Sequence, residues 1–347
     1  MSTVNSTILN RFFGTIPNTI LTFIVFGGVV WLAPALLQWL IIDAVWFSGD
    51  VTACRDVQAA CWAFIHEKYR FILFGRYPFD EQWRPLLAVG FTIIILLLTC
   101  SLRYSWRLLA PLWAIGIIAV IILMRGGILG LSYIRTDLWG GLPLTIFLAL
   151  GSLALAFPLS IALAFGRQSR LPVIRAISRS YIECIRGIPL VSLLFLASFM
   201  LPLFLSPRLQ IDVLIRALAA ITLFSAAYLA ETIRGGLQAI PPCQKEAALA
   251  LGLSTIQTQM LIILPQALRH TLPAITNLFL NIFKNTSLVG IIGLTDLLLA
   301  AKQALIDPSW RAYSLEAYLF ISIAYGSICF SISRYSRALE NRLYKYK

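Results

Sequence analysis

Three polar side chains recur inside one long apolar run at a spacing that could build a polar site within a membrane. Asn277, Asn281 and Lys284 are four and three residues apart, which places them on one face of a helix. The polar residues that follow directly are Asn285, Thr286 and Ser287. Lys284 lies about 15 residues, or about 22 Å, from the start of the run. Because an ammonium at that depth is costly against lipid, it should face a partner, a cavity or water.

Three interpretations of this polar stripe fit the sequence. The side chains could line a cavity that carries a polar solute, or they could form hydrogen bonds that only pack helices together. Lys284 could also extend its ammonium to the outer interface of the membrane. Tyr228, in the preceding apolar run, could line the same path, although a tyrosine there more often packs against its neighbours. We favour the cavity and place the packing ladder second.

Two acid–base pairs repeat the same spacing near the ends of predicted helices. Glu231 and Arg234 are three residues apart, and so are Glu183 and Arg186. This spacing predicts ordinary ion pairs on a helix surface, which we favour over contact with a solute. From their position alone, a further hypothesis is that these residues brace a gate at one end of the path.

The sequence lacks the residue patterns of a catalytic or metal site. His66-Glu67 begins like a zinc-protease motif, but the second histidine is missing. No glycine-rich phosphate loop ending in Lys-Ser or Lys-Thr occurs, so the chain is not expected to hydrolyse ATP itself. No nucleophile stands at a recognisable spacing from a base. We therefore predict no catalytic residue, no metal site and no cofactor in this chain.

Two cysteines share one polar loop. Cys54 and Cys61 are seven residues apart, and their spacing matches no zinc motif. If the loop lies outside the cytoplasm, the pair could form a disulfide.

The composition predicts an all-α membrane protein. Hydrophobic residues make up 59% of the 347 and charged residues 12%, and the mean hydropathy is +0.83. A soluble domain carries about twice that share of charge. The long apolar runs each approach the roughly 20 residues that cross a bilayer as a helix. We predict about eight spans, at roughly 20–42, 86–102, 108–125, 141–165, 186–205, 213–233, 270–289 and 315–333.

The basic residues indicate an orientation rather than a nucleic-acid site. The net charge is +13, but the arginines and lysines cluster in alternate loops, as the positive-inside rule expects. The connector at 166–180 carries four arginines and no acid, and the C-terminal tail is also basic. We therefore expect both termini in the cytoplasm, contact with membrane lipid and no binding of nucleic acid.

The predicted spans divide the chain near residue 138. Residues 1–137 hold three spans and an external loop of mixed charge at 43–85. Residues 138–347 hold five spans and nearly all the informative motifs. We predict an N-terminal membrane extension followed by a five-helix core.

The connector at 234–269 is too long for a simple turn between two spans. It contains a helix-forming block at Gln244–Leu251, which Gly252 follows in the position of a C-terminal cap. Ser254 is a predicted N-cap of a second helix. The short first helix could dock on a partner protein or rest on the membrane surface, and its pattern alone does not choose between them.

The motifs of this connector resemble the EAA loop of ABC-importer permeases. The resemblance rests on Glu246-Ala247-Ala248, on Gly252, and on the ending Leu264-Pro265-Gln266-Ala267-Leu268-Arg269. The Pro-Gln-Ala-Leu-Arg ending is similar to the polar amino-acid branch, and the whole chain resembles the longer permease of the general L-amino-acid importers. The chain departs from the family pattern at Asn285, where aspartate is common, and at Cys243, where glycine is common.

The resemblance implies a type I ABC-importer core preceded by three N-terminal helices. It implies pairing with a second homologous permease, with two cytoplasmic ATPase subunits that use ATP and Mg²⁺, and with a periplasmic substrate-binding protein. It also implies that Glu246, Ala247, Ala248 and Gly252 belong to a helix that couples the permease to the ATPase in the bacterial inner membrane. A stand-alone secondary transporter or channel for small polar solutes is the alternative, and it would need no ATPase.

Overall fold

The computed structural model describes residues 12–47, 52–55, 57–100, 106–206 and 210–344, and these residues are mainly helical. Seven of their helices are long and apolar enough to cross a membrane, or eight if one sharply bent pair counts as a span. This confirms the predicted class and the predicted number of spans. The membrane-crossing helices include α2 (Ile16–Leu37), α5 (Trp83–Cys100), α6 (Trp106–Arg125), α7 (Gly141–Arg167), α11 (Val213–Ala239), α14 (Leu264–Asn285) and α16 (Ser314–Tyr344).

Shorter elements connect these helices. One group comprises α3 (Thr52–Arg55), α4 (Ala63–Phe74), the 3₁₀ turns Phe79–Glu81 and Thr136–Leu138, and α15 (Leu297–Ala304). The bent pair consists of α8 (Pro172–Gly187) and the run formed by α9 (Leu190–Phe195), a π-helical turn at Leu196–Met200 and α10 (Leu201–Phe204). The long connector holds α12 (Pro242–Ala250), α13 (Thr255–Gln257) and a π-helical turn at Thr258–Ile263.

The chain packs as two compact units. The first contains the described residues up to Tyr69 together with Leu305–Leu319, and the second contains Arg70–Ala304 with the described residues from Phe320 onward. This division follows packing density and is of a different kind from the functional division near residue 138, which stays a prediction.

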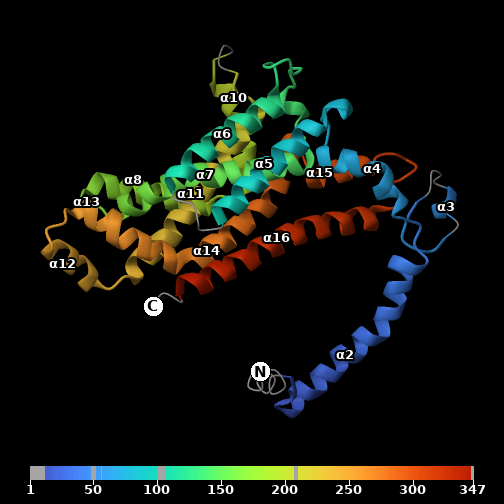
Figure 1. The fold of residues 1–347 in the computed structure, drawn as a ribbon, viewed down its shortest axis with the longest axis horizontal. Coiled ribbons are helices and arrows are strands. Elements are labelled where there is room, and N and C mark those ends of the chain that lie inside the picture. Colours follow the sequence, from blue (N-terminus) through green and yellow to red (C-terminus); the bar gives the residue numbers. More distant parts are fainter. Residues whose placement is uncertain (1–11, 48–51, 56, 101–105, 207–209, 345–347) are drawn as a thin grey trace. The chain divides into compact units, whose positions relative to one another are not determined.

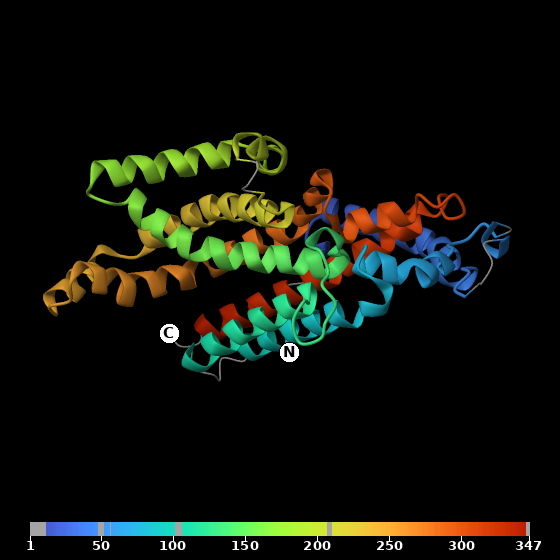
Figure 2. The same ribbon diagram turned by 90° about the horizontal axis from the view of Figure 1, so that it is seen from above.

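Small side chains hold the centre of the second unit together. Helix α11 lies side by side with α7 and α14, as Figures 1 and 2 show. The buried faces of α7 and α11 are rich in alanine and serine, among them Ala149, Ser152, Ala220 and Ala226. Such residues let two helix backbones approach closely, which is how helices associate where lipid removes the hydrophobic driving force between them.

The structure corrects the span that the sequence predicted at 186–205. The apolar helix begins at Leu190, and it meets α8 at an angle of 103°. Gly187 ends α8, and Ile188 is extended with φ −99° and ψ 130°. A residue before proline is pushed out of the helical region, so Pro189 explains the break. The predicted span therefore joins the last turn of one helix to a second helix.

The start of α7 depends on a glycine. Gly141 has φ +63°, and a Cβ at this position would lie 2.0 Å from the carbonyl oxygen of Leu73. Backbone bridges join Gly140 to Thr295 and Gly141 to Asp296, which make a short parallel contact. Asp296 in turn caps α15 by accepting the backbone N–H groups of Leu298 and Leu299 at 3.0 Å each. The close contact of three segments thus requires the absence of a side chain at residue 141.

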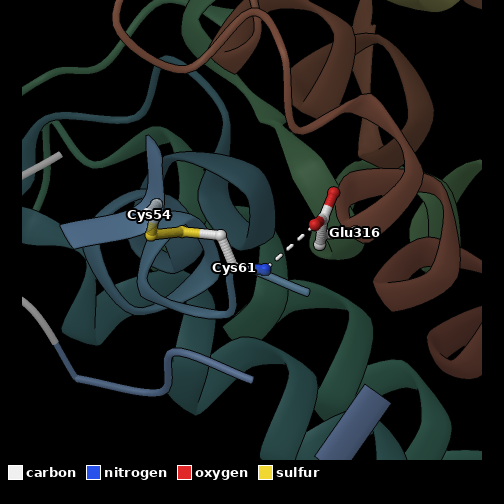
Figure 3. The surroundings of a disulfide bond; sticks show 3 residues. All are labelled: Cys54, Cys61 and Glu316. Atoms are coloured by element: carbon white, nitrogen blue, oxygen red, sulfur yellow. Dashed lines mark hydrogen bonds between the residues drawn. A yellow bond between two sulfur atoms is a disulfide. The ribbon is translucent and has the colours of Figure 1, made fainter. Parts of the chain in front are cut away.

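A disulfide organises the loop of the first unit. Cys54 and Cys61 are bonded with their Cα atoms 5.7 Å apart, and both side chains are buried. The backbone N–H of Cys61 donates to the Glu316 carboxylate at 2.9 Å, as Figure 3 shows. Glu316 is buried in the first turn of α16. The bridge therefore holds a backbone donor against a buried carboxylate that would otherwise lack this partner.

Further contacts fix the same loop to residues 305–319. The Trp310 indole N–H donates to Glu67 at 3.2 Å, and Phe64 packs on the Trp310 ring. Lys68 pairs with Asp307 at 3.1 Å. This hydrogen bond holds the pKa of the Asp307 carboxyl below its usual range. The first unit is thus a folded assembly with its own polar contacts.

The disulfide leads to a labelling prediction. Maleimide should not react with Cys54 or Cys61 in the denatured, unreduced protein, and both should react after reduction. Mass spectrometry of the tryptic peptides measures this directly. Equal labelling before and after reduction would show that the bond is absent.

The variant Cys54→Ser/Cys61→Ser serves as the control, since reduction should change nothing in it. For a bridge spanning seven residues, loop-closure entropy predicts a local loss of about 2–3 kcal/mol. Hydrogen exchange of the loop amides should therefore be faster in this variant.

Candidate functional site

The predicted polar stripe lies on an exposed face of α14. The side chains of Asn277, Asn281 and Lys284 are exposed, and exposed His270 and Ala274 continue the same line toward the start of the helix. Within the described residues, none of the three predicted side chains has a hydrogen-bond or salt-bridge partner. The stripe therefore forms no packing ladder inside this part of the chain. In a membrane it must be covered by water, a solute or another subunit.

The other predicted path residues do not share this face. Thr286 is buried and donates its hydroxyl to the carbonyl of Phe283 at 2.7 Å. Asn285 ends α14, and Ser287 is half-buried in the 3₁₀ turn Thr286–Ile292. Only the first three residues of the predicted set form one exposed stripe.

Tyr228 belongs to a different contact, between α11 and α8. Its hydroxyl donates to the Arg186 carbonyl at 3.3 Å, and its ring packs against Phe224 with centroids 4.7 Å apart. The Arg186 guanidinium lies 5.4 Å from the Tyr228 ring centroid. The tyrosine thus joins two helices, while one edge of it stays half-exposed.

Three of the four predicted brace residues are linked through Arg167, which the sequence reasoning missed. Glu231 and Arg234 form the expected pair, with Nε to Oε2 at 3.0 Å. Arg186 does not pair with Glu183, because its guanidinium lies on Tyr228 instead. Glu183 is paired with Arg179 of the preceding turn and with Arg167. Arg167 also donates to Glu231 at 2.7 Å, so it bridges both acids.

Arg167 carries a signal that the sequence does offer. It stands in the last turn of α7, in a connector that holds arginines and no acid. Such an arginine near the membrane must find an acid on another helix or face water. Its spacing from Glu183 and Glu231 follows no helical period, so only the packed structure identifies the partners.

The helix α12 ends as the sequence predicts. Gly252 has φ +84°, its N–H donates to the Leu249 carbonyl at 3.0 Å, and the N–H of Leu253 donates to the Ala248 carbonyl at 3.2 Å. These two bonds make a Schellman motif, in which glycine is preferred. Ser254 then caps the next helix in a reciprocal capping box with Gln257. The loop is therefore rigidly terminated on both sides of Gly252.

One surface of α12 is free to meet a partner. Glu246 and Ala247 are exposed, whereas Ala248 is buried. Leu251 and Ile256 are 83% and 75% exposed at the tip of the connector. Figure 2 shows α12 at the same end of the second unit as the turn between α7 and α8. Exposed apolar side chains beside a charged residue are typical of a protein-binding surface.

Comparison with known proteins places this geometry in a family. Residues 156–345 match the model of the binding-protein-dependent transport system inner membrane component. The chain belongs to this family. It is therefore the multi-pass membrane component, or permease, of an ABC transporter, and the family favours this function over a stand-alone transporter.

Two relatives align with the permease over almost its whole length. It is 43% identical over 336 residues to the inner membrane amino-acid ABC transporter permease protein YhdY of Escherichia coli, covering 95% of this chain and 90% of that protein. It is 34% identical to the glutamate/glutamine/aspartate/asparagine transport system permease protein BztC of Rhodobacter capsulatus, covering 96% of this chain and 92% of that one. The predicted family is confirmed.

A solved structure is similar to part of the permease. The crystal structure of an amino acid ABC transporter with histidines superposes with a TM-score of 0.51 at 31% sequence identity. The superposition covers 57% of this chain and 90% of that chain. The type I importer core is thus shared with a solved transporter.

The position of Lys284 leads to a prediction about solute binding. Lys284→Ala should raise the KM for uptake about tenfold or more, the effect of losing one hydrogen bond from a charged group. Lys284→Arg should retain part of the affinity because it keeps the charge. Uptake of labelled solute by the assembled transporter in proteoliposomes measures both.

Lys302→Ala is the matched control, since Lys302 is an exposed lysine on α15 away from the stripe. It should leave uptake unchanged. If Lys284→Ala transports with wild-type kinetics and range, the lysine only packs or reaches the membrane interface.

Proposed function

We propose that this chain is one permease of an ATP-driven importer that carries L-amino acids from the periplasm to the cytoplasm. The observation that carries the proposal is the alignment with YhdY, an amino-acid permease, along nearly the whole chain. BztC and the superposed transporter are named for amino-acid transport as well. A shared fold alone would not support a substrate class, but identity at this level across both units does.

The proposed transporter needs three kinds of partner. A second homologous permease covers the other side of the path, and a periplasmic binding protein delivers the amino acid. Two cytoplasmic ATPase subunits bind and hydrolyse ATP with Mg²⁺, since this chain has no phosphate loop. Both termini lie in the cytoplasm, as the basic loops indicate.

The proposed coupling element is α12 with its glycine-terminated end. Its exposed Glu246 and Ala247 lie beside exposed apolar side chains, which fit a cleft on an ATPase subunit. Ala248 is buried against the permease, so the helix has one face for each protein. When ATP binding closes the pair of ATPase subunits, a rigid helix that contacts both the ATPase and the permease would transmit the motion to α11 and α14.

The proposed path runs along the exposed stripe of α14. The two asparagines offer donors and acceptors, and Lys284 offers a positive charge suited to an α-carboxylate. The partner permease would close the path over these side chains. The helix bundle would have two states, with the path open either to the periplasm or to the cytoplasm. The ATPase would shift the equilibrium between these two states.

Reconstitution of the assembled transporter tests the function. We expect uptake of labelled L-amino acids that requires ATP and the binding protein and that vanadate inhibits. Uptake that follows an ion gradient without ATP would contradict the proposal. A panel of acidic, amide, basic and apolar amino acids would define the substrates.

Substitutions in α12 test the coupling role. Glu246→Lys should lower the uptake per ATP hydrolysed about tenfold, because it reverses a charge at the proposed contact. Gly252→Val should act in the same direction by forcing a branched residue to φ +84°, at a cost of about 1–2 kcal/mol. Parallel assays of uptake and of ATP hydrolysis measure the ratio.

Two control variants match these changes. Asp80→Lys reverses an exposed charge far along the chain from α12, and Gly235→Ala fills open space on α11. Both should keep the wild-type ratio. A wild-type ratio in Glu246→Lys and Gly252→Val would remove α12 from the coupling mechanism.

A further inference from the structure

Five charged side chains form one continuous chain of ion pairs at the cytoplasmic-side ends of three helices. We call it the Arg167 network, and its members in order are Arg234, Glu231, Arg167, Glu183 and Arg179. Arg234 and Glu231 belong to α11, Arg167 to α7, and Glu183 and Arg179 to α8. The network therefore connects three helices at this end of α7.

Arg167 supplies the links between helices within this network. The pair Glu231–Arg234 is an i,i+3 pair inside α11, and Arg179–Glu183 is an i,i+4 pair inside α8. Arg167 reaches Glu231 through Nη1 at 2.7 Å and Glu183 through Nη2 at 3.4 Å. A guanidinium can bridge two carboxylates with separate N–H groups, which a lysine ammonium does with less fixed geometry.

The Glu231 side of the bridge is sheltered more than an ordinary surface pair, whereas Glu183 is 49% exposed. The side chains of Arg167 and Glu231 are 21% and 22% exposed, whereas Arg179 is 66% exposed. Pairs that lose water gain strength relative to exposed ones, which contribute little. Among the pairs of the network, Arg167–Glu231 should therefore matter more than Arg179–Glu183.

Two members of the network lie on the part of α11 that leads into the proposed coupling helix α12. Helix α11 ends at Ala239, and α12 begins three residues later at Pro242. On the other side of the loop, Gly236 of α11 meets α14 so closely that a Cβ there would lie 2.8 Å from the Ala267 carbonyl oxygen. A displacement of α12 therefore acts directly on the adjoining end of α11, which carries Glu231 and Arg234.

Apart from the ion pairs of the Arg167 network, few buried side chains hold helix α8 in place. Its buried side chains are Ser178 and Ile182. Tyr181 donates to the Leu223 carbonyl at 2.8 Å, and Tyr228 reaches the Arg186 carbonyl. The 103° break after Gly187 separates α8 from α9. A short helix with a break at one end and few buried side chains can change its angle as a body.

We infer that Arg167 is a positioning residue that ties the orientation of α8 to the state of the coupling helix α12. When α12 shifts the end of α11, Glu231 pulls on Arg167, and Arg167 carries the change to Glu183 on α8. Gly166 beside it lets α8 pack closely on α7, because a Cβ there would lie 2.2 Å from the Ser178 hydroxyl oxygen. The inference rests on the proposed importer function and adds a route from the ATPase contact to a helix of the path.

Uptake per ATP hydrolysed in the reconstituted transporter tests the role of Arg167. Arg167→Met should lower this ratio about tenfold while ATP hydrolysis continues, the factor expected for losing a charge-assisted hydrogen bond. Glu183→Gln should lower it in the same direction, and the double variant should be no worse than Arg167→Met alone. Arg179→Met is the matched control, and it should stay within about twofold because its pair is exposed.

A distance measurement decides the inference without reference to the solute. Nitroxide labels are placed at Ile177→Cys on α8 and Leu155→Cys on α7, two exposed positions, in a variant with Cys100, Cys184, Cys243 and Cys329 replaced by serine. We expect vanadate trapping to change the distance between the two labels when Arg167 and Glu183 are intact. When Arg167→Met or Glu183→Gln is added, vanadate trapping should leave this distance unchanged. Glu183→Gln keeps the shape of the side chain, so it serves if Arg167→Met does not assemble.

Two results would overturn the inference. One is a wild-type uptake-to-hydrolysis ratio in both Arg167→Met and Glu183→Gln. The other is a vanadate-induced change of the α7–α8 distance that is the same with and without Arg167→Met or Glu183→Gln. This result would overturn the inference even if thermal stability falls, since a purely structural brace predicts only the loss of stability. A failure of amino-acid uptake in the wild type, with the distance response intact, would instead contradict the proposed substrate class.

Discussion

Helix α11 packs between α7 and α14 through small side chains, and the functional elements of the second unit are positioned by these two contacts. Alanines and serines line the buried faces, and Gly236 lets α11 approach the backbone of α14. Inside a membrane such close approach replaces the hydrophobic effect as the source of association. The connector that contains α12 joins α11 to α14, so its position depends on the separation of these two helices. Arg167 can reach Glu231 only because α7 and α11 are in contact along the same face.

Local features of the site could be predicted from the sequence because their causes are local. Gly252 ends α12 in a left-handed conformation, and Ser254 begins the next helix through its own hydroxyl. Both depend on residues within four positions, which a reader of the sequence can see. The stripe on α14 follows from helical periodicity in the same way. The number of spans follows from length and hydropathy, since a bilayer allows few alternatives to a long apolar helix.

Other features depend on which helices meet, and the sequence does not contain that information in a local form. The spacing of Glu183 and Arg186 predicts a pair, but Tyr228 on another helix takes the guanidinium and Arg167 takes the acid. The break at Pro189 was hidden inside an apolar run of the right length to cross a membrane, although the proline itself was a visible signal. Helix propensity and the length of an apolar run do not predict which partner a side chain takes when several helices offer one.

The charges of the second unit fall into two classes that suit different tasks. Those of the Arg167 network are paired with one another, whereas Lys284 and the two asparagines of α14 form no hydrogen bond or ion pair within the described residues. An unpaired polar side chain at membrane depth is stable only if something else covers it, so the α14 stripe is suited to a solute or a second permease. The charges of the Arg167 network already have partners within the chain, so they need no solute or second subunit to be stable. The same constraint, that charge in a membrane needs a partner, thus suits one surface to binding and keeps the charges of the other paired within the protein.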